Sequence, residues 1–389
     1  MSLKRVLALS VAPLMVLSLA ACAGGGAGAG AGTDPKPSDS ESGSTSTGDG
    51  EKGSVGVAMP EQTLARWIAD GNAVKDGLEE AGYSVELQYA GNDIPTQQEQ
   101  IDQMITKGVD VLIIASIDGA ALGTQLDNAA AANIPVIAYD RLLTGNENVD
   151  FYVTFDNFNV GVQQGTSLLQ GLGIKDDAGA DTGEKGPFNV ELFAGSPDDN
   201  NARFFFDGAM SVLQPQIDAG TLVVKSGQTE FGQVAIQGWD QAKAQSRMDD
   251  LLTSTYQGEK VQGVLAANDA LARGAISSLQ SNGYDAGDFP PVTGQDSEAA
   301  SAKLILEGLQ FSSIFKDTRK LAAQSIVAAQ DLLNGKAPEA NDTETYDNGK
   351  KFVPSYLLES DIVTKANIVE LLVESGYYTQ DEIESGVAN

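Results

Sequence analysis

The chain contains no histidine, one cysteine and two tryptophans among its 389 residues. Without histidine it lacks the commonest general base and the commonest protein ligand of transition metals, so Ser-His, Cys-His and histidine-based zinc centres are excluded. A single cysteine permits no internal disulfide. Basic residues are also scarce, because 24 Lys and Arg face 54 Asp and Glu, a formal net charge of −30. Such a surface repels phosphate, so we predict no nucleic-acid partner and no direct adhesion to anionic lipid.

The single cysteine, Cys22, ends a segment that is typical of a secretion signal. Lys4 and Arg5 precede an apolar run over residues 6–19, which closes with the tetrad Leu-Ala-Ala-Cys. A positive start, a short apolar stretch and small residues before the cut form a signal peptide, and the run is short for a transmembrane helix. The tetrad resembles a lipobox, so we expect a signal peptide over residues 1–21 and a lipid on Cys22. An ordinary signal peptide with a coincidental cysteine is the alternative.

After Cys22 the composition changes to Gly, Ala, Ser, Thr, Asp and Pro, with almost nothing to bury, as far as residue 53. This composition predicts a disordered linker, and about 30 such residues span roughly 30 Å. The sequence therefore predicts an extracytoplasmic protein that is lipid-anchored to the outer face of the cell membrane.

From residue 54 onward, short β-rich runs alternate with helical patterns. In Gln97–Lys107, residues Ile101, Met104 and Ile105 follow i, i+3, i+4 spacing, and Asp240–Tyr256 is a second predicted helix. Several strand candidates are almost continuously apolar, as expected for parallel strands covered on both faces. The predicted strands are Val55–Met59, Val85–Tyr89, Val109–Ala115, Pro135–Tyr139, Tyr152–Phe155, Phe188–Phe193, Leu222–Lys225, Val261–Ala266 and Val292–Gly294.

The alternation restarts after Asn157, and alternating strands and helices indicate βαβ units with parallel sheets. We therefore predict an α/β fold with two doubly wound parallel-sheet lobes and a cleft between them. In such sheets ligands bind outside the carboxyl ends of the strands, so the residues that follow each strand are the candidate site.

Polar side chains recur directly after the predicted strands. Asp118 follows the third strand, Asp140 and Arg141 follow the fourth, and Asn268 and Asp296 follow strands of the second lobe. Carboxylates, amides and guanidinium groups suit sugar hydroxyls, and indole rings suit the C–H faces of a sugar. Each residue alone also fits a turn or a helix cap, as Asn268 could cap the helix after it. Their recurrence at equivalent strand ends favours a polyol site.

Several of these stretches resemble one known family, in order and at the family's spacing. They are Arg66-Trp67, Gln88-Tyr89-Ala90, Val136–Arg141, Phe155-Asp156-Asn157, Gly195–Ala202, Asn268-Asp269-Ala270, Gly294-Gln295-Asp296 and Val353–Leu358. They resemble the xylose-binding and multiple-monosaccharide-binding proteins, which belong to the ribose/galactose type of periplasmic binding proteins that feed ABC importers. The resemblance runs from about Ser54 to the C-terminus and implies a periplasmic binding protein of type I.

The resemblance also implies roles for individual residues. Asp140 and Arg141 would hold the sugar from the first lobe, together with Arg66, while Trp67 and Trp239 would pack on its two faces. The second-lobe ligands that the resemblance implies are Asp199, Asn200, Asn201, Asn268, Asp296 and, close to the hinge, Lys316. Asp118 joins this set by its place at a strand end.

Members of this family cross between their lobes three times and close like a hinge over the ligand. We place the crossings near Leu142–Asn148, Phe315–Asp317 and Asn341–Lys351. The N-terminal lobe would then hold residues 54–141 and 318–341, and the C-terminal lobe residues 150–315 and 346–389.

The sequence thus predicts a monomeric lipoprotein that captures a monosaccharide of the xylose, glucose, galactose or arabinose class and delivers it to the permease subunits of an ABC importer. The alternative is a sugar-sensing or signal-molecule-binding protein of the same fold, coupled to a receptor. We predict no catalytic residues, no cofactor and no metal. No phosphate-binding glycine motif follows the first strand, and the acidic stretch at 176–184 lacks the carboxylate spacing of a calcium loop. The rival functions are a sugar- or nucleotide-converting enzyme and a transcription regulator, which would need a basic helix-turn-helix at its N-terminus.

Overall fold

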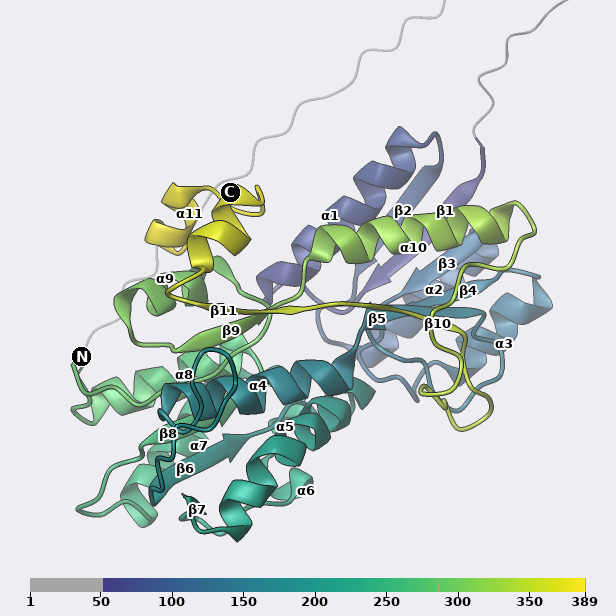
Figure 1. Ribbon diagram of the computed structural model, residues 1–389. Helices are drawn as coiled ribbons and strands as arrows, with labels where there is room; N and C mark the ends of the chain where they lie inside the picture. The colour runs from purple at the N-terminus through teal and green to yellow at the C-terminus, as the bar shows by residue number, and fades with distance from the viewer. Residues whose placement is uncertain (1–51, 286, 389) are drawn as a thin grey trace, which may run out of the picture. The chain divides into compact units, whose positions relative to one another are not determined.

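The computed structural model describes residues 52–285 and 287–388, in which two groups of β-strands are each covered by helices (Figure 1). The predicted signal peptide, Cys22 and nearly all of the predicted linker lie outside the described residues.

The first group is a six-stranded parallel sheet assembled from distant parts of the chain. Its strands, in spatial order, are β10 (Ser355–Leu358), β5 (Phe151–Phe155), β4 (Val136–Tyr139), β3 (Val111–Ile114), β1 (Ser54–Met59) and β2 (Ser84–Tyr89). The central strands β3 and β4 are buried along their whole length, as expected for parallel strands with helices on both faces.

Alternate residues of these strands pack into two different apolar clusters, one on each face of the sheet. Val57 and Ile113 join the cluster beneath α1 (Ala65–Glu80) and α10 (Thr318–Leu333), which lie side by side. Ala58 and Leu112 join the cluster beneath α2 (Ile94–Lys107) and α3 (Gly123–Ala131). Because successive residues of a strand point to opposite faces, each strand packs against helices on both sides of the sheet (Figure 1).

The second group is centred on three parallel strands and is extended by isolated bridges. Its strands are β7 (Leu222–Val224), β6 (Phe188–Phe193) and β8 (Gly263–Ala266), followed by an antiparallel pair, β9 (Ser312–Phe315) and β11 (Asp361–Thr364). Single bridges, Val264 with Val292 and Gln295 with Ile314, join the two sets through residues 292–295.

Helices pack in pairs around this second group. In the chain order the remaining helices are α4 (Asn157–Gly171), α5 (Asn200–Asp218), α6 (Phe231–Val234), the short 3-10 turn η1 (Gln237–Trp239), α7 (Gln241–Ser254), α8 (Asp269–Ser281), α9 (Ala299–Glu307), the π-type turn η2 (Val369–Glu374) and α11 (Gln380–Ser385). The close pairs are α4 with α5, α7 with α8, and α9 with α11.

The predicted fold class is confirmed, and most predicted elements lie within one or two residues of the observed ones. Helix α2 begins three residues earlier than predicted because Asp93 caps it, with its side chain accepting from Thr96 N. The predicted strand Val292–Gly294 is wrong as a strand, since this segment makes only isolated bridges. Strand β11 runs antiparallel to β9, whereas purely parallel sheets were predicted.

The predicted lobe boundaries need correction. Strand β5 pairs with β4, with Phe151 opposite Ile137, and β10 pairs with β5, so both extend the first sheet rather than the second. The segments 142–149 and 341–353 do not cross between the sheets but bond to each other, with Gly145 N donating to Asn348 O (2.7 Å) and Asn348 Nδ2 donating to Asn146 O (2.8 Å).

The chain passes between the sheets at three points, two of which differ from the predicted places. They are residue 156 between β5 and α4, residues 316–317 between β9 and α10, and residues 359–360 between β10 and β11. The second of these agrees with the predicted place near Phe315–Asp317. We call residues 54–155 with 318–358 the first lobe, and residues 157–315 with 361–388 the second lobe.

Candidate functional site

A small cavity lies where the carboxyl ends of strands from both lobes meet. Asp140 and Arg141 directly follow β4, and Lys316 directly follows β9. The cavity is lined by Leu64, Arg66, Trp67, Asp140, Arg141, Asp199, Phe205, Trp239, Asn268, Gln295, Asp296 and Lys316. Among the predicted binding residues, Asp118, Asn200 and Asn201 are not in this lining.

A buried ion network occupies one side of the cavity. Arg66 uses three nitrogens: Nε contacts Asp70 Oδ2 at 2.9 Å, Nη2 contacts Asp140 Oδ2 at 2.9 Å, and Nη1 contacts Asp296 Oδ1 at 3.3 Å. Lys316 Nζ lies 3.1 Å from Asp296 Oδ1 and 3.9 Å from Asp140 Oδ2. Because Asp140 and Asp296 belong to different lobes, Arg66 and Lys316 tie the lobes together at this point.

The network sets the charge states of its members. Burial opposes the charge of Arg66, yet the carboxylates of Asp140, Asp70 and Asp296 hold its pKa well above the ordinary value. Burial also works against the Asp140 carboxylate, but Arg66 and Lys316 lower its pKa below the usual range. The cavity therefore presents fixed charged groups, which bind hydroxyl groups more strongly than neutral ones do.

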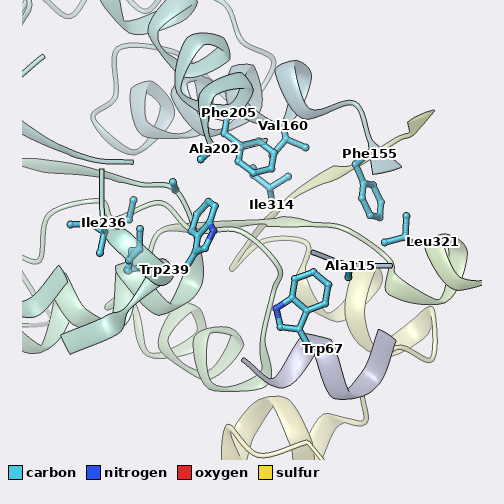
Figure 2. Packing of buried hydrophobic residues seen from close by; sticks show 14 of the residues in the cluster. Trp67, Ala115, Phe155, Val160, Ala202, Phe205, Ile236, Trp239, Ile314 and Leu321 are labelled. Atoms are coloured by element: carbon cyan, nitrogen blue, oxygen red, sulfur yellow. The ribbon is translucent and has the colours of Figure 1, made fainter. Parts of the chain in front are cut away.

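Aromatic rings form other parts of the lining. The guanidinium carbons of Arg66 and Arg141 lie 4.5 Å and 5.1 Å from the centre of the Trp67 ring, which is 2% exposed. Trp239 packs edge-on against Phe205, with ring centres 6.3 Å apart. Both indoles belong to one buried cluster that is continuous between the lobes (Figure 2).

Three buried side-chain nitrogens lack hydrogen-bond partners among the described residues, and two of them, Trp67 Nε1 and Arg141 Nε, belong to cavity residues. Trp67 Nε1 meets no acceptor there. Arg141 Nε lies 3.1 Å from Asp199 Oδ2 as an ion pair, but its N–H does not make a hydrogen bond of good geometry. Unsatisfied buried donors are rare, so these two are available to acceptor oxygens of a ligand.

Three cavity residues have left-handed backbone conformations. The φ angles are 60° at Asp140, 54° at Trp239 and 90° at Asp296. Such conformations are uncommon in non-glycine residues and are rarest for a bulky side chain such as Trp. Their concentration around one cavity is typical of a functional site, where the fold holds strained residues in place.

Two predicted residues cap helices as well as lining the cavity. Asn268 Oδ1 accepts from Leu271 N at 2.9 Å and caps α8, so only its NH₂ group remains for a ligand. Asp199 Oδ1 accepts from Asn201 N at 3.0 Å and caps α5, while its Oδ2 accepts from Trp239 Nε1 at 3.2 Å. Each of these two residues therefore caps a helix and still lines the cavity.

The structure does not bring Asp118, Asn200 and Asn201 to the cavity. Asp118 and Asn200 line a separate surface pocket, where Asp118 Oδ1 accepts from Ala120 N in its own turn. Asn201 is buried, but its Nδ2 donates to Asp140 O (2.6 Å) and its Oδ1 accepts from the hydroxyl of Tyr152 (2.9 Å). Its amide thus joins the second lobe to the first.

The cavity is also lined by three residues that were not predicted, Leu64, Phe205 and Gln295. Asp70, which was not predicted either, forms an ion pair with Arg66 outside the lining. Asp70 lies four residues after Arg66 on α1, so the i, i+4 charge spacing could have indicated it. Gln295 precedes Asp296 and could have been included with it. Nothing in the local sequence distinguishes Leu64.

The Asp70 carboxyl makes the folding stability depend on pH. Burial raises its pKa from 3.8 to about 6, against the opposing effect of Arg66. Between these values the folded protein holds a proton that the unfolded chain has lost, so the free energy of unfolding should fall as pH rises from about 4 to about 7, on the order of 3 kcal/mol for this group. We expect Asp70→Asn to remove this part of the slope in urea titrations. The exposed Asp76→Asn on the same helix is the control; equal slopes in the wild type and Asp70→Asn would contradict the assignment.

In the part of the chain that the structure describes, no helix combines the length and apolar character that crossing a bilayer requires. The same residues hold no group of three or more Cys, Asp or Glu side chains placed to bind a metal ion.

Comparison with known proteins gives consistent matches over most of the chain. The family described as periplasmic binding protein domain matches residues 55–337. The multiple sugar-binding periplasmic receptor ChvE of Rhizobium radiobacter is 53% identical over 336 residues, covering 86% of this chain and 93% of that protein. The D-xylose-binding periplasmic protein of Escherichia coli strain K12 is 34% identical over 329 residues, covering 85% and 92%.

A solved structure is similar over the same region. An ABC transporter solute-binding protein from Clostridium phytofermentans, with bound β-D-glucose, superposes with a TM-score of 0.80 at 47% identity, covering 85% of this chain and 99% of that one.

Proposed function

Since this chain belongs to the family of periplasmic binding protein domains, we propose that it captures one monosaccharide in the cavity between its lobes and delivers it unchanged to an ABC importer. The observation that carries the proposal is the convergence of charged, amide and indole groups from both lobes on one cavity. The glucose-bound relative and the sugar-binding relatives support the same ligand class.

The lining suits a polyol. Asp140 and Asp296 offer carboxylate oxygens to hydroxyl donors, while Arg141 and Asn268 offer N–H groups to hydroxyl and ring oxygens. Trp239 offers an apolar ring face to the C–H groups of a sugar. A site with this many fixed polar groups rejects a ligand that lacks one of the matching hydroxyls, because its own group would be left unpaired.

Lobe closure accounts for capture. Contacts between the lobes, such as Arg66 with Asp296 and Asn201 with the Asp140 carbonyl, surround the cavity, and the three chain crossings provide a hinge. A sugar that contacts both lobes favours the closed arrangement by as much as it prefers that arrangement to the open one. The permease subunits would then distinguish closed from open protein.

We further propose that Cys22 carries a lipid, so that residues 23–53 tether the two lobes to the outer face of the membrane. This proposal rests on the signal-like segment before Cys22, which lies outside the described residues.

A panel of D-xylose, D-glucose, D-galactose and L-arabinose, tested by thermal shift, would identify the ligand. A ligand at about a hundredfold excess over its Kd should stabilise the protein by about 2.7 kcal/mol and raise its Tm accordingly. Recovery of the sugar unaltered, observed by NMR, separates binding from enzymatic conversion. Failure of every sugar in a broad panel to move the Tm would contradict the proposal.

A second candidate is a receptor-coupled sugar sensor, which the name of the receptor that is 53% identical favours. Deleting the permease genes distinguishes the two. Loss of sugar uptake supports delivery to the importer, whereas a sugar response that persists without uptake supports sensing.

A further inference from the structure

A fully buried carboxylate, Asp269, lies behind the second-lobe side of the cavity without lining it. It follows Asn268 at the start of α8 and is 0% exposed. Its Oδ1 accepts from Ser313 Oγ at 2.8 Å and from Gln310 Nε2 at 2.9 Å, and its Oδ2 accepts from Glu298 N at 2.8 Å. Every one of these partners is a donor, so the site requires an acceptor at both carboxylate oxygens.

These contacts hold the strained turn that carries Asp296. The φ angles are 90° at Asp296 and 49° at Ser297. Ser297 N donates to Ser313 Oγ at 2.9 Å, and the next peptide N–H, that of Glu298, donates to Asp269. The Asp269 carboxylate therefore fixes both peptide N–H groups after Asp296. It holds that of Glu298 directly and that of Ser297 through the Ser313 hydroxyl.

The segment leading into the turn is fixed by the same residue. Asp269 N donates to Gln295 O at 3.0 Å. A methyl group at Gly294 would lie 2.2 Å from Asp269 Oδ1 and 2.3 Å from Gln310 Nε2, so the backbone passes in direct contact with this group. The chain from Gly294 to Glu298 thus has little freedom to shift without breaking contacts to Asp269.

Burying the ionisable Asp269 carboxyl group in the core lowers the stability of the fold. Burial, together with the nearby Glu298 carboxylate, raises its pKa from 3.8 to about 7. An apolar residue would avoid this cost, so stability alone does not explain a carboxyl group here. A role in holding the strained turn beside the cavity explains the buried carboxyl group more specifically.

We propose that Asp269 is a positioning residue for the ligand site, holding the turn at Asp296-Ser297 so that the Asp296 carboxylate points into the cavity. This inference rests on the proposed sugar-binding function. Asp296 reaches Arg66 and Lys316 from this turn, so a shift of the turn alters the cavity's charged side as well as the Asp296 contact itself.

The test compares Asp269→Asn with Glu191→Gln. Glu191 is a matched control because it is also fully buried in the second lobe and accepts from Tyr256 (2.8 Å) and twice from Ser226, away from the cavity lining. Both variants should lower the Tm. At a temperature where both are folded, calorimetry should show sugar affinity reduced at least about tenfold in Asp269→Asn and within about twofold of wild type in Glu191→Gln.

Ser313→Ala is the second variant, since it removes only the hydroxyl between Asp269 and Ser297 N and leaves the carboxylate in place. It should also weaken binding, and it decides the matter if Asp269→Asn does not fold. In an Asp296→Asn background, measured at millimolar sugar, either substitution should have an effect less than about twofold, because the group being positioned is already altered.

Affinity of a folded Asp269→Asn or Ser313→Ala protein within twofold of wild type would overturn the positioning role. An equal loss in the wild-type and Asp296→Asn backgrounds would overturn it too, since it would indicate a general structural effect. If the wild-type protein itself binds no sugar, the proposed function fails first, so the two failures are distinguishable.

Discussion

Replacing Asp140 with asparagine is expected to weaken monosaccharide binding by at least about 30-fold, or about 2 kcal/mol. The substitution keeps the shape of the side chain and tolerates the left-handed backbone at this position, where φ is 60°. It removes the negative charge that contacts Arg66 at 2.9 Å and lies 3.9 Å from Lys316. The buried cations Arg66 and Lys316 would then have one carboxylate fewer nearby, and the ligand would lose a charged hydrogen-bond acceptor.

Asp118→Asn is the matched control for this prediction. Asp118 also follows a strand of the first sheet, but it lines the separate surface pocket rather than the cavity. Titration calorimetry should show its affinity within about twofold of wild type. If Asp140→Asn retained wild-type affinity, the cavity would not be the sugar site, whatever Asp118→Asn does.

Trp239→Ala should have a comparable effect on affinity and a larger one on stability. The indole supplies the ring face, donates to Asp199 Oδ2 at 3.2 Å and packs against Phe205. We expect binding at least about 30-fold weaker and the free energy of unfolding lower by about 3 kcal/mol, measured by calorimetry and urea titration. Trp239→Phe should restore part of the affinity, because it keeps an aromatic face and loses only the N–H and the larger ring.

The position of the ring can be tested without removing it. A methyl group at Gly195 would lie 2.0 Å from Trp239 Cη2, so Gly195→Ala must displace the indole. Gly123→Ala is the control, since a methyl group there has no neighbour within 4 Å. Weaker binding in Gly195→Ala than in Gly123→Ala supports ring placement as the determinant; equal affinities would show that the indole face is not used.

Local patterns in the sequence and the family resemblance together predicted most of the residues that line the cavity. The strands were recognisable because apolar runs ended at polar residues, and parallel strands bring such ends to one edge. Asp140, Arg141, Asn268 and Asp296 were therefore placed together by their positions alone. The family resemblance added Asp199 and Lys316, and also Arg66, Trp67 and Trp239, which lie on helices or turns and follow no strand directly.

The lobe boundaries could not be read in this way. Strand β5 follows a loop that resembles a linker between domains, yet it pairs with β4, and its other neighbour, β10, lies about 200 residues later in the chain. Pairing between such distant segments depends on the packing of the whole sheet and leaves no local signal. The predicted crossings near Leu142–Asn148 and Asn341–Lys351 were wrong for the same reason.

Side-chain direction was the other source of error. Asn201 stands in the predicted binding loop, but its amide bonds to the Asp140 carbonyl and to Tyr152 across the cleft. Asn200, one residue earlier on α5, points toward the surface pocket instead. Neighbouring helical residues face about 100° apart, so only a few in any such loop can reach one cavity.

The path of the chain has a consequence for biosynthesis. Strands β10 and β11 are separated by only two residues, and each completes the edge of a different sheet. A nascent polypeptide that has not yet reached residue 355 therefore lacks the edge strand of both halves, even though all the residues that line the cavity have already been made. Premature termination or proteolytic trimming at this tail would damage both halves in one event.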